Sequence, residues 1–198
     1  AMSEDRSEVG GRRSELPLAP EAEHDPAGVS RRDVMRFLGV APLAATLGWS
    51  PTGLARAARY VDEVQSPASH LPPPTAPKFF TQREWRTVRL LADYVIPRDE
   101  KSGSATDAKA PEFVDYMLAD KETTEASRIA MRGGLAWLDL ESRRRFQTTF
   151  VGASDAQRRQ ILDDIAWPKR AKPELSQGVA FFTRFRDAVA SGFYSSAM

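Results

Sequence analysis

The sequence predicts an all-α protein, a single small domain of about five helices that follows an extended N-terminal arm. Three observations predict this fold class. Apolar residues recur at spacings of three and four, which is the period of a helix with one buried face. Two segments begin with the Ser/Thr-x-x-Glu/Gln pattern of a helix capping box. No segment alternates apolar and polar residues strongly enough to predict a β-strand.

The first helix of the domain is predicted over residues 82–95. Thr81 stands as its N-cap and Glu84 follows three residues later, so both side chains can satisfy free backbone N–H groups. The apolar residues of this segment share one face at helical spacing. Pro97 ends the helix because its ring excludes a further helical turn.

An acidic loop and a second helix follow. Residues 98–110 contain acidic, glycine and other small residues that cannot build an apolar face, so we expect a loop. Pro111 suits the first turn of a helix because the N–H that it lacks has no partner there. Glu112 and Asp115 lie near the same helix start, where the helix dipole favours negative charge.

Three more helices are predicted in the C-terminal half. The longest covers residues 124–145, and its two adjoining apolar stripes indicate burial on more than one side. Ser154 begins a second capping box and hence a fourth helix. A fifth helix is expected over residues 173–190, with Gly192 placed to stop it.

Two adjacent glycines interrupt the longest of these helices. Gly133 and Gly134 each cost about 1 kcal/mol of helix stability relative to Ala. We therefore expect them either to allow the close approach of another backbone or to break the helix.

The leader ahead of the domain has the pattern of a twin-arginine export signal. Its charged motif consists of Ser30, Arg31, Arg32 and Arg36. The apolar run of residues 37–49 that follows is shorter than the roughly 20 apolar residues of a membrane-spanning helix. We therefore predict export to the periplasm and no transmembrane anchor in this chain. The alternative is a buried helix preceded by a chance arginine pair.

A signal peptidase site is predicted at the end of the leader. Ala55 and Ala57 are small residues that flank a single position, so the mature chain is expected to begin near Ala58. After this site a run of prolines favours extended geometry, either as a free linker or as an arm across a partner. The predicted organisation is a disordered leader with its signal peptide at 1–57, a proline-rich linker or arm at 58–80, and a helical domain at 81–198.

Composition excludes several classes of chemistry. The chain has no cysteine, which excludes disulfides, iron–sulfur ligation and c-type haem attachment. Its two histidines, His24 and His70, lie outside the predicted domain, which excludes a Ser-His-Asp triad and an ordinary zinc or copper site there. No dinucleotide or phosphate-binding glycine motif is present. We therefore predict no catalytic, cofactor-binding or metal-binding residue, and hence that the chain is not an enzyme.

The charged residues also argue against several binding roles. The formal net charge is +1 and the two signs are interspersed, so nucleic acid and anionic membranes are not expected partners. Asp163 and Asp164 are adjacent on a helix and point about 100° apart, so they do not form a catalytic pair. Asp99 and Asp107 leave a carboxylate calcium site as an alternative, although their spacing differs from an EF-hand loop. The run 143–145 of three arginines suits either a helix C-terminus or an acidic partner.

With these landmarks in place, the chain resembles the gluconate 2-dehydrogenase subunit 3 family over residues 79–196. The resemblance rests on short motifs and on their order and spacing along this chain. They are Phe80-Thr81 with Glu84, Leu-Ala-Asp-Tyr-Val-Ile-Pro at 91–97, Pro-Glu-Phe-Val-Asp at 111–115, Gly-Leu-Ala-Trp-Leu-Asp at 134–139, the 150–165 segment, Phe181-Phe182, and Gly-Phe-Tyr-Ser-Ser at 192–196.

The resemblance implies a non-catalytic small subunit in a periplasmic dehydrogenase complex. In such a complex a large flavoprotein of the glucose-methanol-choline (GMC) type binds FAD, oxidises a sugar or alcohol, and often passes electrons to a c-type cytochrome subunit. The small subunit is similar to an escort or chaperone that supplies the export signal and stabilises the large one. The alternative is a free-standing periplasmic helical binding module with a carboxylate metal site in the acidic loop.

If the chain is a subunit, its terminal aromatic residues are candidates for partner binding. Phe79 and Phe80 end the predicted arm, and Phe193 and Tyr194 lie near the C-terminus. Tyrosine and phenylalanine are enriched at protein interfaces, and an aromatic end can fill a groove on a partner. The alternative for the C-terminal pair is a frayed tail.

Overall fold

The computed structural model of the protein describes residues 47–66 and 76–195. These residues form six α-helices and one short 3-10 helix, and they contain no strand. The elements are α3 (Pro51–Gln65), α4 (Gln82–Val95), α5 (Ala110–Ala119), α6 (Glu125–Phe146), α7 (Asp155–Ala166), η1 (Pro173–Leu175) and α8 (Ser176–Ser195). The predicted all-α fold class is confirmed.

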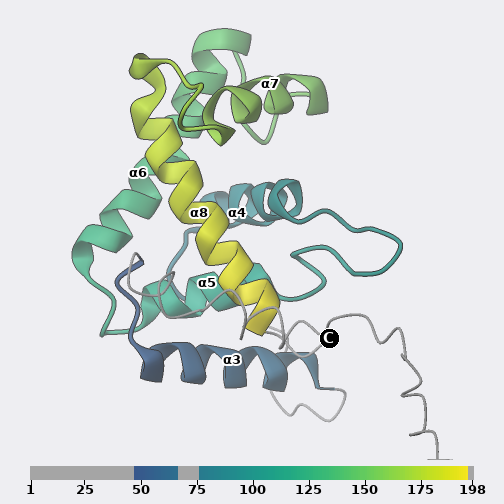
Figure 1. Cartoon of the computed structure of the whole chain (residues 1–198), viewed down its shortest axis with the longest axis vertical. Helices are drawn as coiled ribbons and strands as arrows, with labels where there is room; N and C mark the ends of the chain where they lie inside the picture. Colours follow the sequence, from purple (N-terminus) through teal and green to yellow (C-terminus); the bar gives the residue numbers. More distant parts are fainter. Residues whose placement is uncertain (1–46, 67–75, 196–198) are drawn as a thin grey trace, which may run out of the picture.

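Helix α8 runs diagonally through the middle of the molecule and packs against α4, α5, α6 and α7 (Figure 1). Helix α5 lies between α8 and α3, while α7 packs at the other end beside α6 and α8 (Figure 1). The core between them is built from aromatic and aliphatic side chains. The largest fully buried ones are Phe113, Phe150, Phe185, Leu91, Met117, Leu118, Met131, Leu138, Ile161 and Ile165.

Three of the predicted helix starts of the domain are confirmed, those of α4, α6 and α7. Thr81 and Glu84 form a reciprocal capping box at the start of α4, in which Thr81 N donates to Glu84 Oε2 at 2.8 Å. Ser154 begins the same arrangement at α7. Thr124 caps α6 by accepting a hydrogen bond from Ser127 N. Each of these starts depends on a local side chain that satisfies free N–H groups, and this is why the sequence reveals them.

Helix α3 corrects the predicted linker at 58–80, because residues 58–65 are helical. Ser50 caps this helix by accepting a hydrogen bond from Gly53 N at 3.0 Å, and Pro51 occupies its first turn. Its buried residues, Gly53, Ala57 and Val61, recur every four positions and form one face. The apolar run 37–49, for which a buried helix was the alternative to a signal core, lies outside the described residues except for residues 47–49.

Asp115 on α5 fixes the chain that leads into α4. Its buried carboxylate accepts hydrogen bonds from three successive backbone N–H groups, Lys78 N at 2.5 Å, Phe79 N at 3.0 Å and Phe80 N at 3.1 Å. Three donors on one carboxylate define the path of the chain between residues 78 and 80. The phenylalanines are thereby placed against the helical core.

Gly192 does not stop the last helix, which corrects a second prediction. The residue lies inside α8, and a Cβ there would come within 3.1 Å of the backbone Cα and O of Ala110. The glycine is required because α8 and the start of α5 approach each other closely.

Candidate partner-binding surface

Two of the four aromatic residues predicted to bind a partner belong to the core. Phe80 and Phe193 are each only 4% exposed, and in this fold both rings pack in the core. Phe79 and Tyr194 are half-buried and pack against the same core. Phe79 is further covered by the Arg132 guanidinium, whose centre lies 4.3 Å from the ring centroid. These aromatic residues hold the chain ends onto the domain.

The structure describes the predicted cleavage site but not the twin-arginine motif of the predicted export signal. Ser30, Arg31, Arg32 and Arg36 lie outside the described residues. Ala55 and Ala57, the predicted cleavage residues, lie in the middle of α3, and Ala57 is completely buried. A cut after Ala57 would divide a packed helix.

The acidic loop uses its carboxylates to close its own turns. Asp99 accepts hydrogen bonds from Lys101 N at 2.8 Å and from Ser102 N at 2.6 Å. Asp107 accepts one from Ser104 N at 2.7 Å and pairs with Arg98 at 2.7 Å. Backbone donors therefore lower the pKa of both carboxyl groups. Within residues 47–66 and 76–195, no cluster of His, Cys, Asp and Glu is arranged to hold a metal ion.

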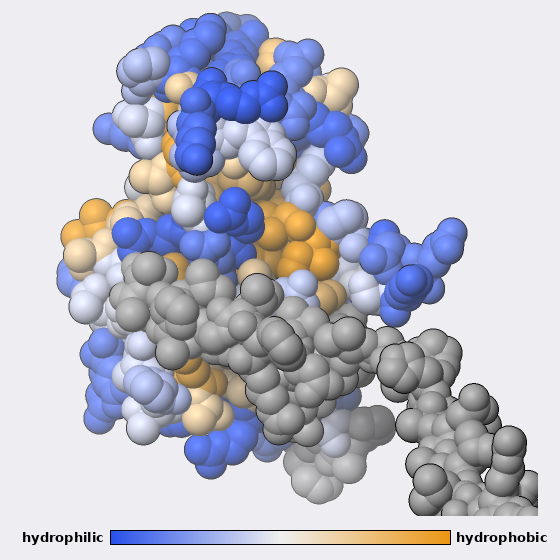
Figure 2. Space-filling model, viewed as in Figure 1, coloured by the Kyte–Doolittle hydropathy of each residue, from blue (hydrophilic) through white to orange (hydrophobic). Residues whose placement is uncertain are grey.

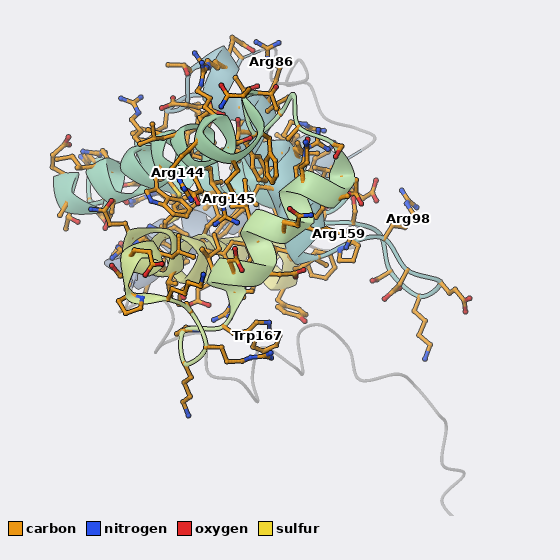
Figure 3. All side chains as sticks on the ribbon, turned by 90° about the horizontal axis from the view of Figure 1, so that it is seen from above. Arg86, Arg98, Arg144, Arg145, Arg159 and Trp167 are labelled. Carbon is orange, nitrogen blue, oxygen red and sulfur yellow. The ribbon has the colours of Figure 1, made fainter. Side chains whose placement is uncertain are left out.

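The three arginines at the end of α6 have different roles. Arg144 and Arg145 both bind the carboxylate of Glu141, at 2.7 and 2.5 Å, and Figure 3 shows the two arginines near the C-terminal end of α6. Arg145 also reaches Asp164 on α7 at 2.6 Å. The hydrogen bonds from Arg144 and Arg145 lower the pKa of Glu141 to about 2. Unlike Arg144 and Arg145, Arg143 makes no ion pair with the described residues.

An exposed apolar ridge runs along α6, and we call it the α6 face. It consists of Ile129, Gly133, Ala136 and Leu140, which follow one another at spacings of four, three and four residues and are all exposed. Ile129 is 63% and Leu140 is 66% exposed, and both are among the three most exposed large apolar residues of the described chain. In the space-filling view, apolar surface shows at the left edge, where α6 lies (Figure 2).

A groove lies on each side of the α6 face. The first has a volume of about 380 Å³, lies between α4 and α6, and is bordered by Arg83, Ala136, Asp139, Leu140 and Arg143. The second has a volume of about 400 Å³ and lies between α6 and α8. It is bordered by Ile129, Gly133, Trp137, Phe181 and Arg184.

Each groove contains one arginine without an ionic partner among the described residues. In the first groove Arg83 pairs with Asp139 at 2.7 Å, while Arg143 is unpaired. In the second, Arg184 on α8 is also unpaired. This surface was not predicted, because α6 is apolar on several sides and its exposed ridge has the same spacing as a core stripe. Its spacing was nevertheless visible in the sequence.

A small all-α domain whose longest helix exposes an apolar face suits a subunit of a larger assembly. None of the helices in the described ranges is long and apolar enough to cross a membrane. The chain belongs to the gluconate 2-dehydrogenase subunit 3 family, whose family model matches residues 82–198. The matched region begins with α4 and leaves α3 outside it. Searches of curated proteins and of solved structures found no match.

The family membership makes the chain a subunit of a dehydrogenase complex, which is consistent with an accessory role. The same membership is consistent with a larger partner subunit.

Proposed function

We propose that this chain is the non-catalytic small subunit of a periplasmic, FAD-dependent dehydrogenase complex. It binds a large flavoprotein of the GMC type, which holds the FAD and oxidises a sugar or alcohol. A c-type cytochrome subunit accepts the electrons in complexes that contain one. The observation that carries this proposal is the family match, which includes all five helices of the domain.

The proposal assigns two tasks to the chain. The motif of Ser30, Arg31, Arg32 and Arg36 directs the assembled complex to the twin-arginine pathway, which carries folded proteins. The helical domain stabilises the large subunit while it acquires FAD. This division of labour explains why a chain without cysteine, and without histidine in its helical domain, carries a signal for the export of folded proteins.

The structure supplies no argument for a free-standing module with a metal site. That alternative depends on the carboxylates of the acidic loop, and Asp99 and Asp107 are engaged by N–H groups of the loop itself.

The proposal is tested by producing the large subunit with and without this chain and measuring its FAD content and its amount in the periplasm. With the chain present, FAD-loaded large subunit is expected in the periplasm. The double variant Arg31→Lys/Arg32→Lys is the control, because it keeps the charge and alters the motif. Both subunits are then expected to stay in the cytoplasm as a complex. A large subunit that reaches the periplasm loaded with FAD in the absence of this chain would contradict the proposal.

A further inference from the structure

We propose that the α6 face is the surface to which the large subunit binds, through a helix with an apolar stripe and carboxylates along both edges. This inference rests on the proposed function and names the surface and the chemistry of its partner. It is carried by three features of α6, which are an unexplained glycine, the spacing of the ridge, and the charge of the two grooves.

Gly133 is the first feature. Its neighbour Gly134 is needed inside the domain, because a Cβ there would come within 1.8 Å of the ring of Phe181. A Cβ on Gly133 would meet nothing within 4 Å. Glycine weakens the middle of a helix, so a position that does not need it for packing favours another residue. The missing side chain of Gly133 is explained if a second helix approaches α6 at this point.

The second feature is the spacing of the ridge. Ile129 and Leu140 are separated by 11 residues, or roughly 16 Å of helix, with the small residues Gly133 and Ala136 between them. Two large apolar side chains around a flat centre allow a partner helix to lie close across α6. The grooves on either side of the ridge accept the side chains of that helix, as in the packing of ridges into grooves.

The third feature is charge. Asp139 already pairs with Arg83, and Glu84 lies 3.7 Å from Arg132, so the acidic groups beside the ridge are compensated. Arg143 in one groove and Arg184 in the other are left without ionic partners among the described residues. Burying either guanidinium under a partner is unfavourable unless the partner supplies a carboxylate. The fitting partner is therefore a helix that is apolar in its centre and acidic at both edges.

The test uses the full chain produced together with the large subunit, and it measures co-purification and the dissociation constant of the complex. The variants are Leu140→Glu, Arg143→Glu and Gly133→Leu, all at exposed positions that the domain does not need for packing. Each is expected to weaken the complex at least tenfold while the melting temperature of the isolated chain stays within a few degrees of wild type.

Two matched controls carry the same kinds of change elsewhere. Trp167→Glu changes an apolar residue that is 61% exposed and lies just beyond the end of α7, outside the α6 face (Figure 3). Lys101→Glu reverses a charge in the acidic loop, on the opposite side of the molecule from α6 (Figure 1). Both controls are expected to bind like wild type.

The possible results separate the two proposals. If wild type and all variants bind equally well, the α6 face is not the docking surface and the proposed function stands. If Leu140→Glu instead dissociates a dimer of this chain, the occupant is a second copy and the inference is wrong. If deletion of residues 1–46 exposes the face to a partner that the full chain does not bind, the leader is the occupant. If the wild-type chain binds no flavoprotein, both proposals fail.

A second inference rests on α3 and is independent of the α6 face. We infer that residues 47–65 remain part of the mature subunit, so that no cleavage occurs after Ala57. Leu47 and Trp49, which precede the helix, are 3% and 6% exposed, and the Trp49 ring meets Phe113 of α5 edge-on at 6.0 Å. Ser127 on α6 donates a hydrogen bond to Leu47 O at 3.1 Å.

The outer side of α3 is attached to α5 as well. Arg56 pairs with Asp120 at 2.8 Å, and Tyr60 stacks on Tyr116 with ring centroids 4.8 Å apart. The ammonium group of Lys78 lies over both of these rings, at 3.9 and 4.6 Å. A cut after Ala57 would release Trp49 and Arg56 and expose the apolar surface of α5. A protein exported in the folded state presents this segment as a packed helix, whereas proteases need an extended chain.

The N-terminus of the periplasmic protein tests this inference by intact mass. The expected N-terminus lies at or before residue 47. A mass that corresponds to a chain beginning at Ala58 would overturn the inference. Trypsin provides a second readout on the purified full chain, because α3 contains Arg56 and Arg59 and the acidic loop contains Lys101. Cleavage is expected at Lys101 well before α3, and equally rapid cleavage within α3 would contradict its packing.

Discussion

Phe181 on α8 lies directly against Gly134 on α6, so that a Cβ at Gly134 would come within 1.8 Å of Phe181 Cδ2 and 2.0 Å of Cγ. The adjacent residue, Gly133, faces open space. Two consecutive glycines of one helix therefore stand in opposite environments. This contrast gives the first prediction.

Gly134→Ala is expected to destabilise the isolated chain by about 1–3 kcal/mol, because the added methyl group forces Phe181 or the helix to move. Gly133→Ala is expected to stabilise it by up to about 1 kcal/mol, since alanine favours the helix and meets no atom. Chemical unfolding of the two variants measures both effects. Changes of the same sign would show that α6 and α8 do not pack as described.

Asp115→Ala is expected to lower the free energy of unfolding by at least about 2 kcal/mol. The variant leaves the N–H groups of Lys78, Phe79 and Phe80 without their charged acceptor. Asp163→Ala on the exposed side of α7 is the control, and its effect is expected to stay within about 0.5 kcal/mol. Equal effects of the two substitutions would show that Asp115 does not hold the start of α4.

Glu141 is expected to make stability depend on pH. Its folded pKa of about 2 lies below its ordinary value of 4.5. Its contribution to the free energy of unfolding is therefore present above pH 4.5 and is lost as the pH falls toward 2. Glu141→Gln should therefore cost about 2–3 kcal/mol near neutral pH and much less at pH 3. Denaturant unfolding at the two pH values measures the difference. A cost that is the same at both would contradict the ion pairs with Arg144 and Arg145.

Glu112 is expected to act with the opposite sign. Burial raises the pKa of this carboxyl group, although Arg89 lies 2.8 Å away, and one of its oxygens has no hydrogen-bond partner in the described structure. Its contribution to the free energy of unfolding is present below the unfolded pKa and is lost as the pH rises through the folded pKa. In Glu112→Gln this decrease in stability with rising pH should be absent. The variant and wild type are compared by unfolding between pH 4 and pH 7, and parallel pH curves would contradict the prediction.

The sequence was sufficient wherever the determining signal is local. The starts of α4 and α7 depend on side chains three residues apart, Thr81 with Glu84 and Ser154 with Gln157. These starts were predicted to the residue. The fold class followed from the same local patterns.

Features that depend on distant contacts were missed. The small residues Ala55 and Ala57 have the pattern of a cleavage site, and only the contact of α3 with α5 shows that Ala57 occupies a packed face. Gly192 has the pattern of a helix end, whereas its function depends on Ala110, 82 positions earlier in the chain. Phe80 and Phe193 lie near the domain ends, but their apolar area is used in the core.

The candidate binding surface was missed for a different reason. Ile129 and Leu140 repeat at helical spacing like the core residues of α6, such as Met131 and Leu138. Periodicity identifies apolar faces, but it does not tell which face meets another helix of the same chain. That distinction requires the positions of α4 and α8.

The central claim is that this chain works as a subunit bound to a flavoprotein. The most direct measurement is native mass spectrometry of the complex isolated from the periplasm through a tag on this chain. The account predicts a complex that contains this chain, one larger GMC-type subunit and non-covalently or covalently bound FAD in that subunit. A chain recovered alone, or with FAD bound to itself, would contradict it.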